Sequence, residues 1–257
     1  NFAKAVEFAG LTFIGSKSKA IALMGSKSVS KKKMIEAKVP CIPGYQGDDQ
    51  SDNTLLKSAK KIGFPLMIKA SAGGGGRGMR LVNQVDDLKD ALKIARAEAL
   101  NAFGSSELIL EKAFVNARHI EIQIISDAYG SHLYFGERDC SIQRRHQKVI
   151  EESPSPVMTK MLREKMGKAA VCAAKAVDYT NAGTIEFLVD DQLNYYFLEM
   201  NTRIQVEHPV TEMVTGYDLI ALQFLVAQGA KLPMKQSDIA ITGHAIEARI
   251  YAEDPNN

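Results

Sequence analysis

The chain has 257 residues, of which 46% are apolar and 24% are charged, and its formal net charge is +2. This length can form one large domain or two ordinary ones, and the composition is that of a globular protein rather than a disordered one. So small a charge does not predict a nucleic-acid partner, and no apolar stretch approaches the roughly 20 residues of a membrane-spanning helix.

The first 41 residues are expected to form a helix, a short strand and two further helices. The helical pattern is already under way at Phe2–Val6, without an initiator methionine, so we expect a segment of a longer protein. The short strand is predicted at Leu11–Ile14. The basic run Lys31–Lys33 precedes apolar residues at helical spacing, and we interpret it as the solvated face of a helix rather than a binding patch.

A compact block follows, in the order helix, strand, glycine run, strand, helix, strand. Helical patterns cover Asp52–Ile62 and residues 85–103. Strands are expected at Leu66–Lys69, Met79–Val82 and Leu108–Leu110. The block is small enough to form a separate lobe.

The remainder of the chain predicts antiparallel hairpins beside one strong helix. Strands are expected at His119–Ile124, His132–Phe135, Thr184–Asp190 and Tyr195–Met200, and the helix at residues 158–178. Hairpins packed beside helices favour an α+β fold over a run of βαβ units.

Cysteine and histidine usage gives no sign of a zinc site. Cys41, Cys140 and Cys172 have neither metal-ligand spacing nor the even count of a disulfide framework, which is typical of a reducing compartment. His132 and His208 are expected to be structural.

The glycine run Gly73–Gly78 satisfies the letters of the dinucleotide motif G-x-G-x-x-G. That motif requires a helix to open at its last glycine, whereas a strand is predicted at Met79–Val82. A Walker A loop is excluded as well, because no Gly-Lys-Ser/Thr follows. We interpret the run as a hairpin loop whose backbone N–H groups close over phosphates, with Lys69 adding positive charge. A flexible linker is the alternative.

Three polar residues lie inside apolar strands. Glu199 and Asn201 are two residues apart and share a strand face, and Glu186 lies within the apolar run Thr184–Val189. A carboxylate in such surroundings is costly to desolvate unless it is compensated. Mg²⁺ favours one or two carboxylates together with phosphate oxygens, so we expect a metal site. Salt bridges at a strand edge are the alternative.

Two polar segments extend this site. Thr202–Glu212 directly continues the strand that carries Glu199, so it brings Arg203 and Glu207 to the same place. Glu137–Lys148 is a second dense polar segment with little helical periodicity.

These segments look like the signatures of a known family. Residues 199–209 and the Arg-Arg-His-Gln-Lys run at 144–148 resemble those of biotin carboxylases, within the ATP-grasp superfamily. Three further segments match the same pattern in the same order: Lys69–Ser71 with the glycine run, residues 111–119, and Gly243–Arg249. Gly44–Gln50 resembles the alpha subunits of acyl-CoA carboxylases, especially the methylcrotonyl- and propionyl-CoA types.

The resemblance implies an α+β ATP-grasp fold with a small glycine-rich lid subdomain and a larger antiparallel-sheet subdomain. Residues 1–41 would be the end of an amino-terminal α/β subdomain and a linker. Residues 42–113 would form the lid. Residues 114–257 would form the catalytic subdomain, incomplete at its carboxy-terminal end.

The resemblance also implies roles in binding ATP and its metal ion. The residues expected at the phosphates are Lys27 and Lys69, with Gly74, Gly75 and Gly76 in the lid. Those expected at the adenine, ribose and phosphates are Glu111, Lys112, Phe114, His119, Gln143 and His146. Those expected at Mg²⁺ or Mn²⁺ are Glu186, Glu199 and Asn201.

The implied reaction is carboxylation of biotin by bicarbonate and ATP through carboxyphosphate, the first half-reaction of an acyl-CoA carboxylase. The residues expected to hold bicarbonate are Lys148, Arg203, Gln205 and Val206. Glu207 would be the general base, with Lys148 and Arg203 keeping it ionised. Arg249 would face the biotin enolate.

The sequence contains no Ala-Met-Lys-Met biotin-attachment motif, so biotin is expected to arrive on another domain. The partners implied are a biotin carboxyl carrier domain, a carboxyltransferase beta subunit and further copies of the carboxylase. Neither nucleic acid nor a membrane is expected as a partner. The expected location is the bacterial cytoplasm or, in a eukaryote, the mitochondrial matrix.

Two alternatives remain open at this point. Another ATP-grasp ligase, such as one similar to carbamoyl-phosphate synthetase, would share the lid and the metal carboxylates. It would not be expected to carry residues 144–148 or 205–209. A non-catalytic nucleotide-binding or assembly fragment is the second alternative, and the presence of every polar group that the chemistry needs argues against it.

Overall fold

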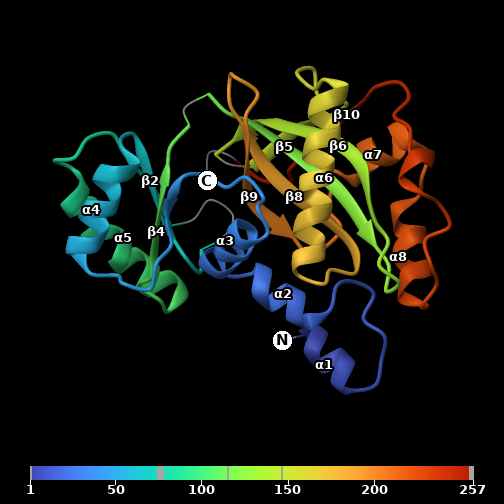
Figure 1. Cartoon of the computed structure of the whole chain (residues 1–257), viewed down its shortest axis with the longest axis horizontal. Coiled ribbons are helices and arrows are strands. Elements are labelled where there is room, and N and C mark those ends of the chain that lie inside the picture. The colour runs from blue at the N-terminus through green and yellow to red at the C-terminus, as the bar shows by residue number, and fades with distance from the viewer. Residues whose placement is uncertain (1, 74–77, 115, 146, 255–257) are drawn as a thin grey trace.

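The computed structural model describes residues 2–73, 78–114, 116–145 and 147–254. Within them lie two antiparallel sheets, each covered by helices, with the helix at Lys27–Glu36 (α3) between the sheets (Figure 1). The α+β class predicted from the sequence is therefore confirmed.

The chain begins with three helices, α1 (Phe2–Phe8), α2 (Ser18–Met24) and α3 (Lys27–Glu36). Ser26 caps α3, because its hydroxyl accepts a hydrogen bond from the backbone N–H of Val29 at 3.4 Å.

Two predictions for this segment are wrong. Leu11–Ile14 forms no strand, because no neighbouring strand of the described structure pairs with it. The interpretation of Lys31–Lys33 as a solvated face fails for Lys31, whose side chain is only 6% exposed. The helical period was correct, but the face that carries Lys31 is covered by the first sheet.

The first sheet has four strands in the order β1-β4-β2-β3. Their bounds are β1 Gly44–Tyr45, β2 Leu66–Ala70, β3 Met79–Val82 and β4 Leu108–Lys112. Helices α4 (Asp52–Ile62) and α5 (Leu88–Phe103) pack against it, and their apolar residues join those of the strands in one core. Strands β2 and β3 pair antiparallel, so the glycine run does join two strands of a hairpin, as predicted.

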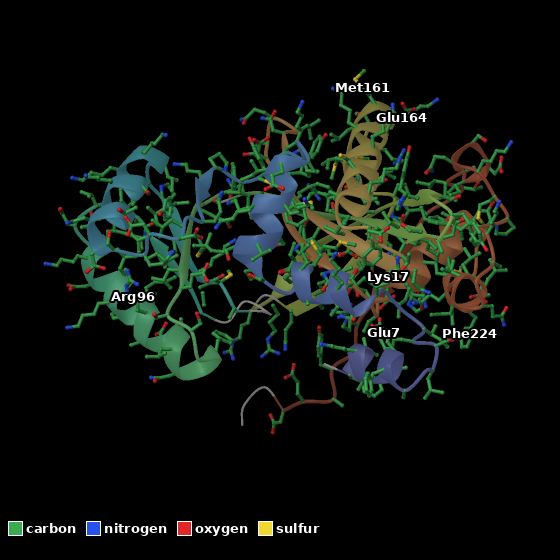
Figure 2. The ribbon with its side chains drawn as sticks, turned by 60° about the horizontal axis from the view of Figure 1, so that its bottom comes forward. Glu7, Lys17, Arg96, Met161, Glu164 and Phe224 are labelled. Atoms are coloured by element: carbon green, nitrogen blue, oxygen red, sulfur yellow. The ribbon has the colours of Figure 1, made fainter. Side chains whose placement is uncertain are left out.

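The second sheet has six strands in the order β10-β7-β6-β5-β8-β9. Their bounds are β5 Arg118–Ser126, β6 His132–Arg144, β7 Gln147–Ser153, β8 Asn181–Val189, β9 Tyr195–Asn201 and β10 Ala245–Ala248. Helix α6 (Lys160–Ala176) lies across one face of this sheet (Figure 1). Figure 2 shows Met161 and Glu164 projecting from α6 into solvent.

The rest of the fold lies at the other face and at the end of this sheet. It consists of α7 (His208–Thr215), α8 (Leu219–Ala227) and a short 3₁₀ turn at Gln236–Asp238. No single helix of the described residues is long and apolar enough to cross a membrane. The pair α7 and α8 passes that test only when the two helices are taken together across a bend of 98°.

The alternation of side chains along β5 explains where the polar site forms. Ile120, Ile122 and Ile124 join the core under α6. Glu121 and Gln123 therefore point to the opposite face, where they meet Arg138 of β6. Strand β6 runs to Arg144, well beyond the predicted end at Phe135. Its charged residues Glu137, Arg138 and Asp139 are buried against other charged groups, so no apolar pattern marked this half of the strand.

Candidate active site

A cavity of about 770 Å³ is lined by residues of both sheets and of α3. Most of the predicted site residues lie in its wall: Lys27, Lys69, Lys112, Phe114, His119, Gln143, Lys148, Glu186, Glu199, Asn201, Arg203, Gln205, Val206, Glu207 and Arg249. The tertiary structure thus brings together residues up to 222 positions apart in the chain, from Lys27 to Arg249.

The other predicted residues are not in the described wall. Glu111 is buried behind it, and its carboxylate accepts hydrogen bonds from Lys69 and Lys31. Burial acts to raise the pKa of Glu111, but Lys69 and Lys31 outweigh it and lower that pKa to about 2. Gly74, Gly75, Gly76 and His146 lie outside the described residues.

Two carboxylates face each other across β8 and β9. Glu186 and Glu199 are directly opposed in the strand register, and Asn201 donates to Glu186 Oε1 at 2.8 Å. Lys27 Nζ lies 2.6 Å from Glu199 Oε2. Like charges directly opposite each other destabilise a sheet unless a cation lies between or beside them. Two carboxylates with an amide nearby are also a donor set that suits a hard divalent cation, so the residues present fit the predicted metal.

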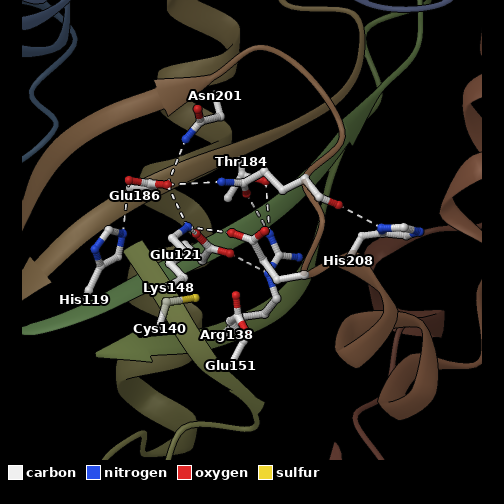
Figure 3. A network of polar contacts seen from close by, with 12 residues as sticks. His119, Glu121, Arg138, Cys140, Lys148, Glu151, Thr184, Glu186, Asn201 and His208 are labelled. Atoms are coloured by element: carbon white, nitrogen blue, oxygen red, sulfur yellow. Dashed lines mark hydrogen bonds and ion pairs between the residues drawn. The ribbon is translucent and has the colours of Figure 1, made fainter. Parts of the chain in front are cut away.

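Glu186 is nearly buried and is surrounded by donors. Besides Asn201, its Oε1 accepts from Lys148 at 3.0 Å and from Gln205 at 3.1 Å, and its Oε2 lies 3.0 Å from His119 Nε2 (Figure 3). Burial acts to raise the pKa of Glu186, but His119 and Lys148 lower it below its ordinary value. The same contact raises the pKa of His119 against the opposing effect of burial.

Lys148 is the centre of the polar network. Its ammonium donates to three carboxylates, those of Glu121 at 2.6 Å, Glu186 at 3.0 Å and Glu207 at 2.6 Å (Figure 3). An ammonium has three donors, so all of them are used. Burial acts to lower the pKa of Lys148, but the three carboxylates raise it above its ordinary value.

Glu207 lies between two cations. Lys148 contacts its Oε1, and Arg249 Nη2 donates to its Oε2 at 2.8 Å. Burial acts to raise the pKa of Glu207, but Lys148 and Arg138 lower it to about 2. The carboxylate is therefore ionised at neutral pH, as predicted.

The prediction that Arg203 helps to hold Glu207 is wrong. Arg203 was expected to share in holding this carboxylate, but within the described ranges it forms no ion pair with it. Its guanidinium instead donates to the carbonyl of Ile204 at 3.1 Å and to Asn201 at 3.4 Å. Arg249 takes its place because pairing of β7 with β10 brings the carboxy-terminal strand beside Glu207.

The sequence analysis missed Arg138, which is fully buried. All five of its N–H donors are used, and their acceptors are Glu121, Gln123, Thr184, Thr211 and Gln205. The bond from Arg138 Nη2 to Gln205 Oε1 at 2.9 Å turns the Gln205 amide so that its NH₂ group faces Glu186. The only sign of Arg138 in the sequence is that it is a charged residue in a segment that could pair as a strand.

Glu121 and Glu151 were missed as well. Glu121 joins Arg138 to Lys148, with oxygens 2.5 Å and 2.6 Å from them. Glu151 is buried beside Arg249, which donates to it. Glu121 alternates with isoleucines in β5, and that pattern alone could have singled it out, as it did Glu186 in β8.

The opposite part of the cavity is less charged. Phe114 stacks on Tyr196 with ring centroids 4.9 Å apart. Apolar residues that the sequence analysis did not select, including Met67, Leu188 and Leu198, also line the wall. Gln143 lies 3.1 Å from His119 Nδ1 and donates to the carbonyl of Cys140. A partly apolar and aromatic wall beside lysines and carboxylates suits an aromatic ring that carries phosphates.

Comparison with known proteins identifies the domain type. A family model for the ATP-binding domain of the carbamoyl-phosphate synthase L chain matches residues 26–235. The chain is 52% identical over 257 residues to the mitochondrial methylcrotonoyl-CoA carboxylase subunit alpha of Dictyostelium discoideum, covering all of this chain and 37% of that protein. It is 54% identical over 247 residues to the biotin carboxylase of a Nostoc species, covering 96% of this chain and 55% of that protein.

Solved structures give the same result. The chain matches the crystal structure of a biotin carboxylase–beta-gamma-ATP complex from Campylobacter jejuni, with a TM-score of 0.94 and 49% identity. It matches the biotin carboxylase domain of Hydrogenobacter thermophilus 2-oxoglutarate carboxylase, in complex with MgADP and bicarbonate, equally well. These matches cover 99% of this chain and 57% and 56% of those chains. The predicted ATP-grasp fold is therefore confirmed, for a chain that spans between about a third and a little over half of its relatives.

Proposed function

The chain belongs to the ATP-grasp family of carbamoyl-phosphate synthase L chain ATP-binding domains, and on that premise we propose that it carboxylates biotin with ATP and bicarbonate. This would be the first half-reaction of a biotin-dependent acyl-CoA carboxylase, as the names of its relatives suggest. One observation carries the proposal. Glu207 is held between Lys148 and Arg249 in a cavity that also contains the opposed carboxylates of Glu186 and Glu199.

We propose that the nucleotide occupies the cavity with its base near Phe114 and its phosphates near Lys69 and Lys27. The support is the position of an apolar, partly aromatic wall beside these lysines. Glu186 and Glu199, with Asn201 alongside, would hold Mg²⁺ or Mn²⁺. When it is bound, the ion neutralises negative charge on the phosphates.

The four-stranded sheet with α4 and α5 would serve as the lid, within the proposed residues 42–113. The six-stranded sheet would carry the catalytic groups, within residues 114–257. Residues 1–41 would belong to the preceding subdomain. The division follows the two sheets, since β4 of the first ends at Lys112 and β5 of the second begins at Arg118.

Glu207 would act as the general base toward bicarbonate. The O–H bond of bicarbonate breaks as its proton moves to Glu207, and the same oxygen attacks the γ-phosphorus to give carboxyphosphate and ADP. Lys148 and Arg249 lower the basicity of Glu207 while they pair with it. An anion bound between them would compete for both cations, which raises the basicity of Glu207 when the substrate is present. Gln205, Val206 and Arg203 would complete the bicarbonate site.

Arg249 would also face the ureido group of biotin, which accepts the carboxyl group from carboxyphosphate as phosphate leaves. Biotin would be carried on a separate carrier domain, and a carboxyltransferase subunit and further copies of the enzyme would be the other partners. The relatives that suggest these partners are alpha subunits or chains of carboxylases. The location would be the mitochondrion in a eukaryote, as in the name of the Dictyostelium relative, and we propose the cytoplasm in a bacterium.

The test is ATP hydrolysis by the complete protein with and without bicarbonate and free biotin. We expect phosphate release to require bicarbonate and to rise when biotin is added. Hydrolysis that needs no bicarbonate, or that responds to ammonia instead of biotin, would favour a different ATP-grasp ligase. Nucleotide binding without any turnover would indicate a non-catalytic module.

A further inference from the structure

Lys31 is a buried cation to which the proposed reaction assigns no role. Its Nζ donates to Glu111 Oε1 at 2.5 Å, and the side chains of Lys31 and Glu111 are 6% and 9% exposed. The other carboxylate oxygen of Glu111, Oε2, accepts a hydrogen bond from Lys69. One buried carboxylate is therefore shared by two ammonium groups, and the three residues come from α3, β4 and β2.

The two lysines differ in what else they can reach. Lys69 is part of the cavity wall, whereas neither Lys31 nor the side chain of Glu111 is among its lining residues. A phosphate in the cavity could contact Lys69 but would not meet Lys31. Glu111 thus has one cation that faces the ligand space and one that lies behind it.

The surroundings hold Lys31 in place. A Cβ atom at Gly44 would lie 2.9 Å from Lys31 Nζ and 2.3 Å from the carbonyl oxygen of Leu110, so only glycine lets β1 pass this closely over the ammonium. Helix α3 is also tied to the end of β2, because Ser71 Oγ donates to Ser28 Oγ at 3.0 Å. The geometry of Lys31 relative to Lys69 is therefore set by the fold.

The electrostatics explain why a second lysine is useful. A carboxylate that loses its only cation inside a protein carries an uncompensated charge, and breaking a buried pair in this way is strongly destabilising. If Lys69 were the only partner of Glu111, a phosphate could attract Lys69 only by leaving the buried Glu111 carboxylate unpaired. With Lys31 present, Glu111 stays paired when Lys69 turns toward another anion.

We propose that Lys31 is a positioning residue for nucleotide binding: by pairing with Glu111, it leaves Lys69 available to a phosphate group in the cavity. The inference rests on the proposed function, in which that phosphate belongs to ATP. It assigns to Lys31 an effect on affinity that is exerted through Lys69 and not through direct contact.

The first experiment measures the Kd for MgATP by calorimetry on the complete protein. Lys31→Met should weaken binding about 10-fold, equivalent to about 1.4 kcal/mol. Lys31→Arg keeps the charge and should stay within about 2-fold of wild type. Lys32→Met is the matched control, since Lys32 pairs with Asp48 near the surface and should leave the Kd unchanged. Wild-type affinity in Lys31→Met would overturn the proposal.

A double-mutant cycle separates an effect through Lys69 from a general loss of positive charge. Once Lys69→Met is in place, adding Lys31→Met should cost no further affinity. If the two losses add in full, Lys31 acts by another route and the inference is wrong. If wild type does not bind MgATP at all, it is the proposed function that fails, which is a different result.

If Lys31→Met does not fold, a second pair of variants tests the proposal. Glu111→Gln removes the charge that Lys31 compensates, so Lys31→Met/Glu111→Gln should bind MgATP within about 2-fold of Glu111→Gln alone. A loss of about 10-fold between these two variants would contradict the proposal. Thermal unfolding of each variant shows whether its fold is retained.

Discussion

The two sheets hold buried charges in different ways. On the four-stranded sheet, one carboxylate is bonded to two lysines, in what we name the Glu111 cluster (Lys31, Glu111 and Lys69). On the six-stranded sheet, cations and carboxylates alternate in what we name the Lys148 chain: Arg138, Glu121, Lys148, Glu207, Arg249 and Glu151. The first arrangement has one more cation than carboxylates, whereas the second has three of each, and its Lys148 also contacts Glu186.

In the proposed function, this difference separates nucleotide binding from the chemical step. Excess positive charge beside a cavity attracts an anion. In the Glu111 cluster, Lys69 can turn toward a phosphate while Lys31 stays paired with Glu111. Glu207 is held by Lys148 and Arg249, which in turn pair with Glu121 and Glu151, so the position and protonation of Glu207 also depend on carboxylates that lie outside the cavity wall. Changes in the Glu111 cluster should therefore alter affinity, whereas changes in the Lys148 chain should alter turnover or stability.

The largest expected effect is that of Glu207→Gln in the Lys148 chain. The amide keeps the shape but cannot accept a proton, so bicarbonate-dependent ATP cleavage and biotin carboxylation should both fall by about 10²–10⁴-fold. The Kd for MgATP should change little, because the nucleotide is proposed to be held elsewhere. Steady-state kinetics at saturating substrate provide the measurement, with Glu164→Gln on the exposed part of α6 as control (Figure 2). Near-normal maximal turnover would remove Glu207 as the base.

Arg138→Met should come next, as a loss of stability. It leaves Glu121 without one of its two cations in a fully buried position, so the free energy of unfolding should fall by about 3–5 kcal/mol. Urea unfolding provides the measurement. Arg80→Met is the matched control, because Arg80 pairs with Glu98 through side chains that are 36% and 49% exposed, and its removal should cost about 1 kcal/mol or less. An equal loss of unfolding free energy in both variants would show that the members of the Lys148 chain do not stabilise one another.

Glu199→Gln tests the ion pair between Glu199 of β9 and Lys27 of α3, which belongs to neither the Glu111 cluster nor the Lys148 chain. If Glu199 holds the metal ion, the Mg²⁺ concentration for half-maximal ATP cleavage should rise by about 10-fold or more. Titration of the rate with Mg²⁺ measures this. Lys27→Met distinguishes the alternative, in which Glu199 only anchors Lys27. In that case, both variants would change the nucleotide affinity alike and leave the Mg²⁺ requirement unchanged.

The smallest effect concerns the far end of the Lys148 chain. Burial and the charges of Glu207 and Glu247 raise the pKa of Glu151 to about 6, although Arg249 opposes them. A raised carboxyl pKa contributes stability that is complete below the unfolded value and is lost as the pH rises through about 6. Glu151→Gln should therefore raise the free energy of unfolding by about 1–2 kcal/mol at about pH 8 and have little effect at about pH 4.

Urea unfolding at the two pH values checks this prediction. Glu164→Gln on the surface of α6 should show no pH-dependent gain. Destabilisation by Glu151→Gln at both pH values would mean that the bond with Arg249 outweighs the cost of burying the charge. Glu151 would then be an ordinary member of the alternating chain.

Local pattern was enough to place many of the helices and strands. The predicted bounds of α4 and β3 agree with the structure, because each is a short apolar pattern between clear breaking residues. The same reasoning selected Glu186, Glu199 and Asn201, since a polar residue in an apolar strand has a desolvation cost that something must offset. It failed for Leu11–Ile14, where the pattern was apolar but no partner strand lies beside it.

The amino-acid sequence by itself determined the α+β class, the hairpin around the glycine run and most of the residues that line the cavity. Only the tertiary structure decided which cation meets which carboxylate. Lys148 and Glu207 are 59 residues apart, and Arg249 and Glu207 are 42 apart, so their contacts depend on sheet order and strand register. The helical period likewise does not show that Lys31 is buried, because burial depends on the sheet that packs against its face. Ion pairing acts through space, whereas periodicity reports only on neighbours along the chain.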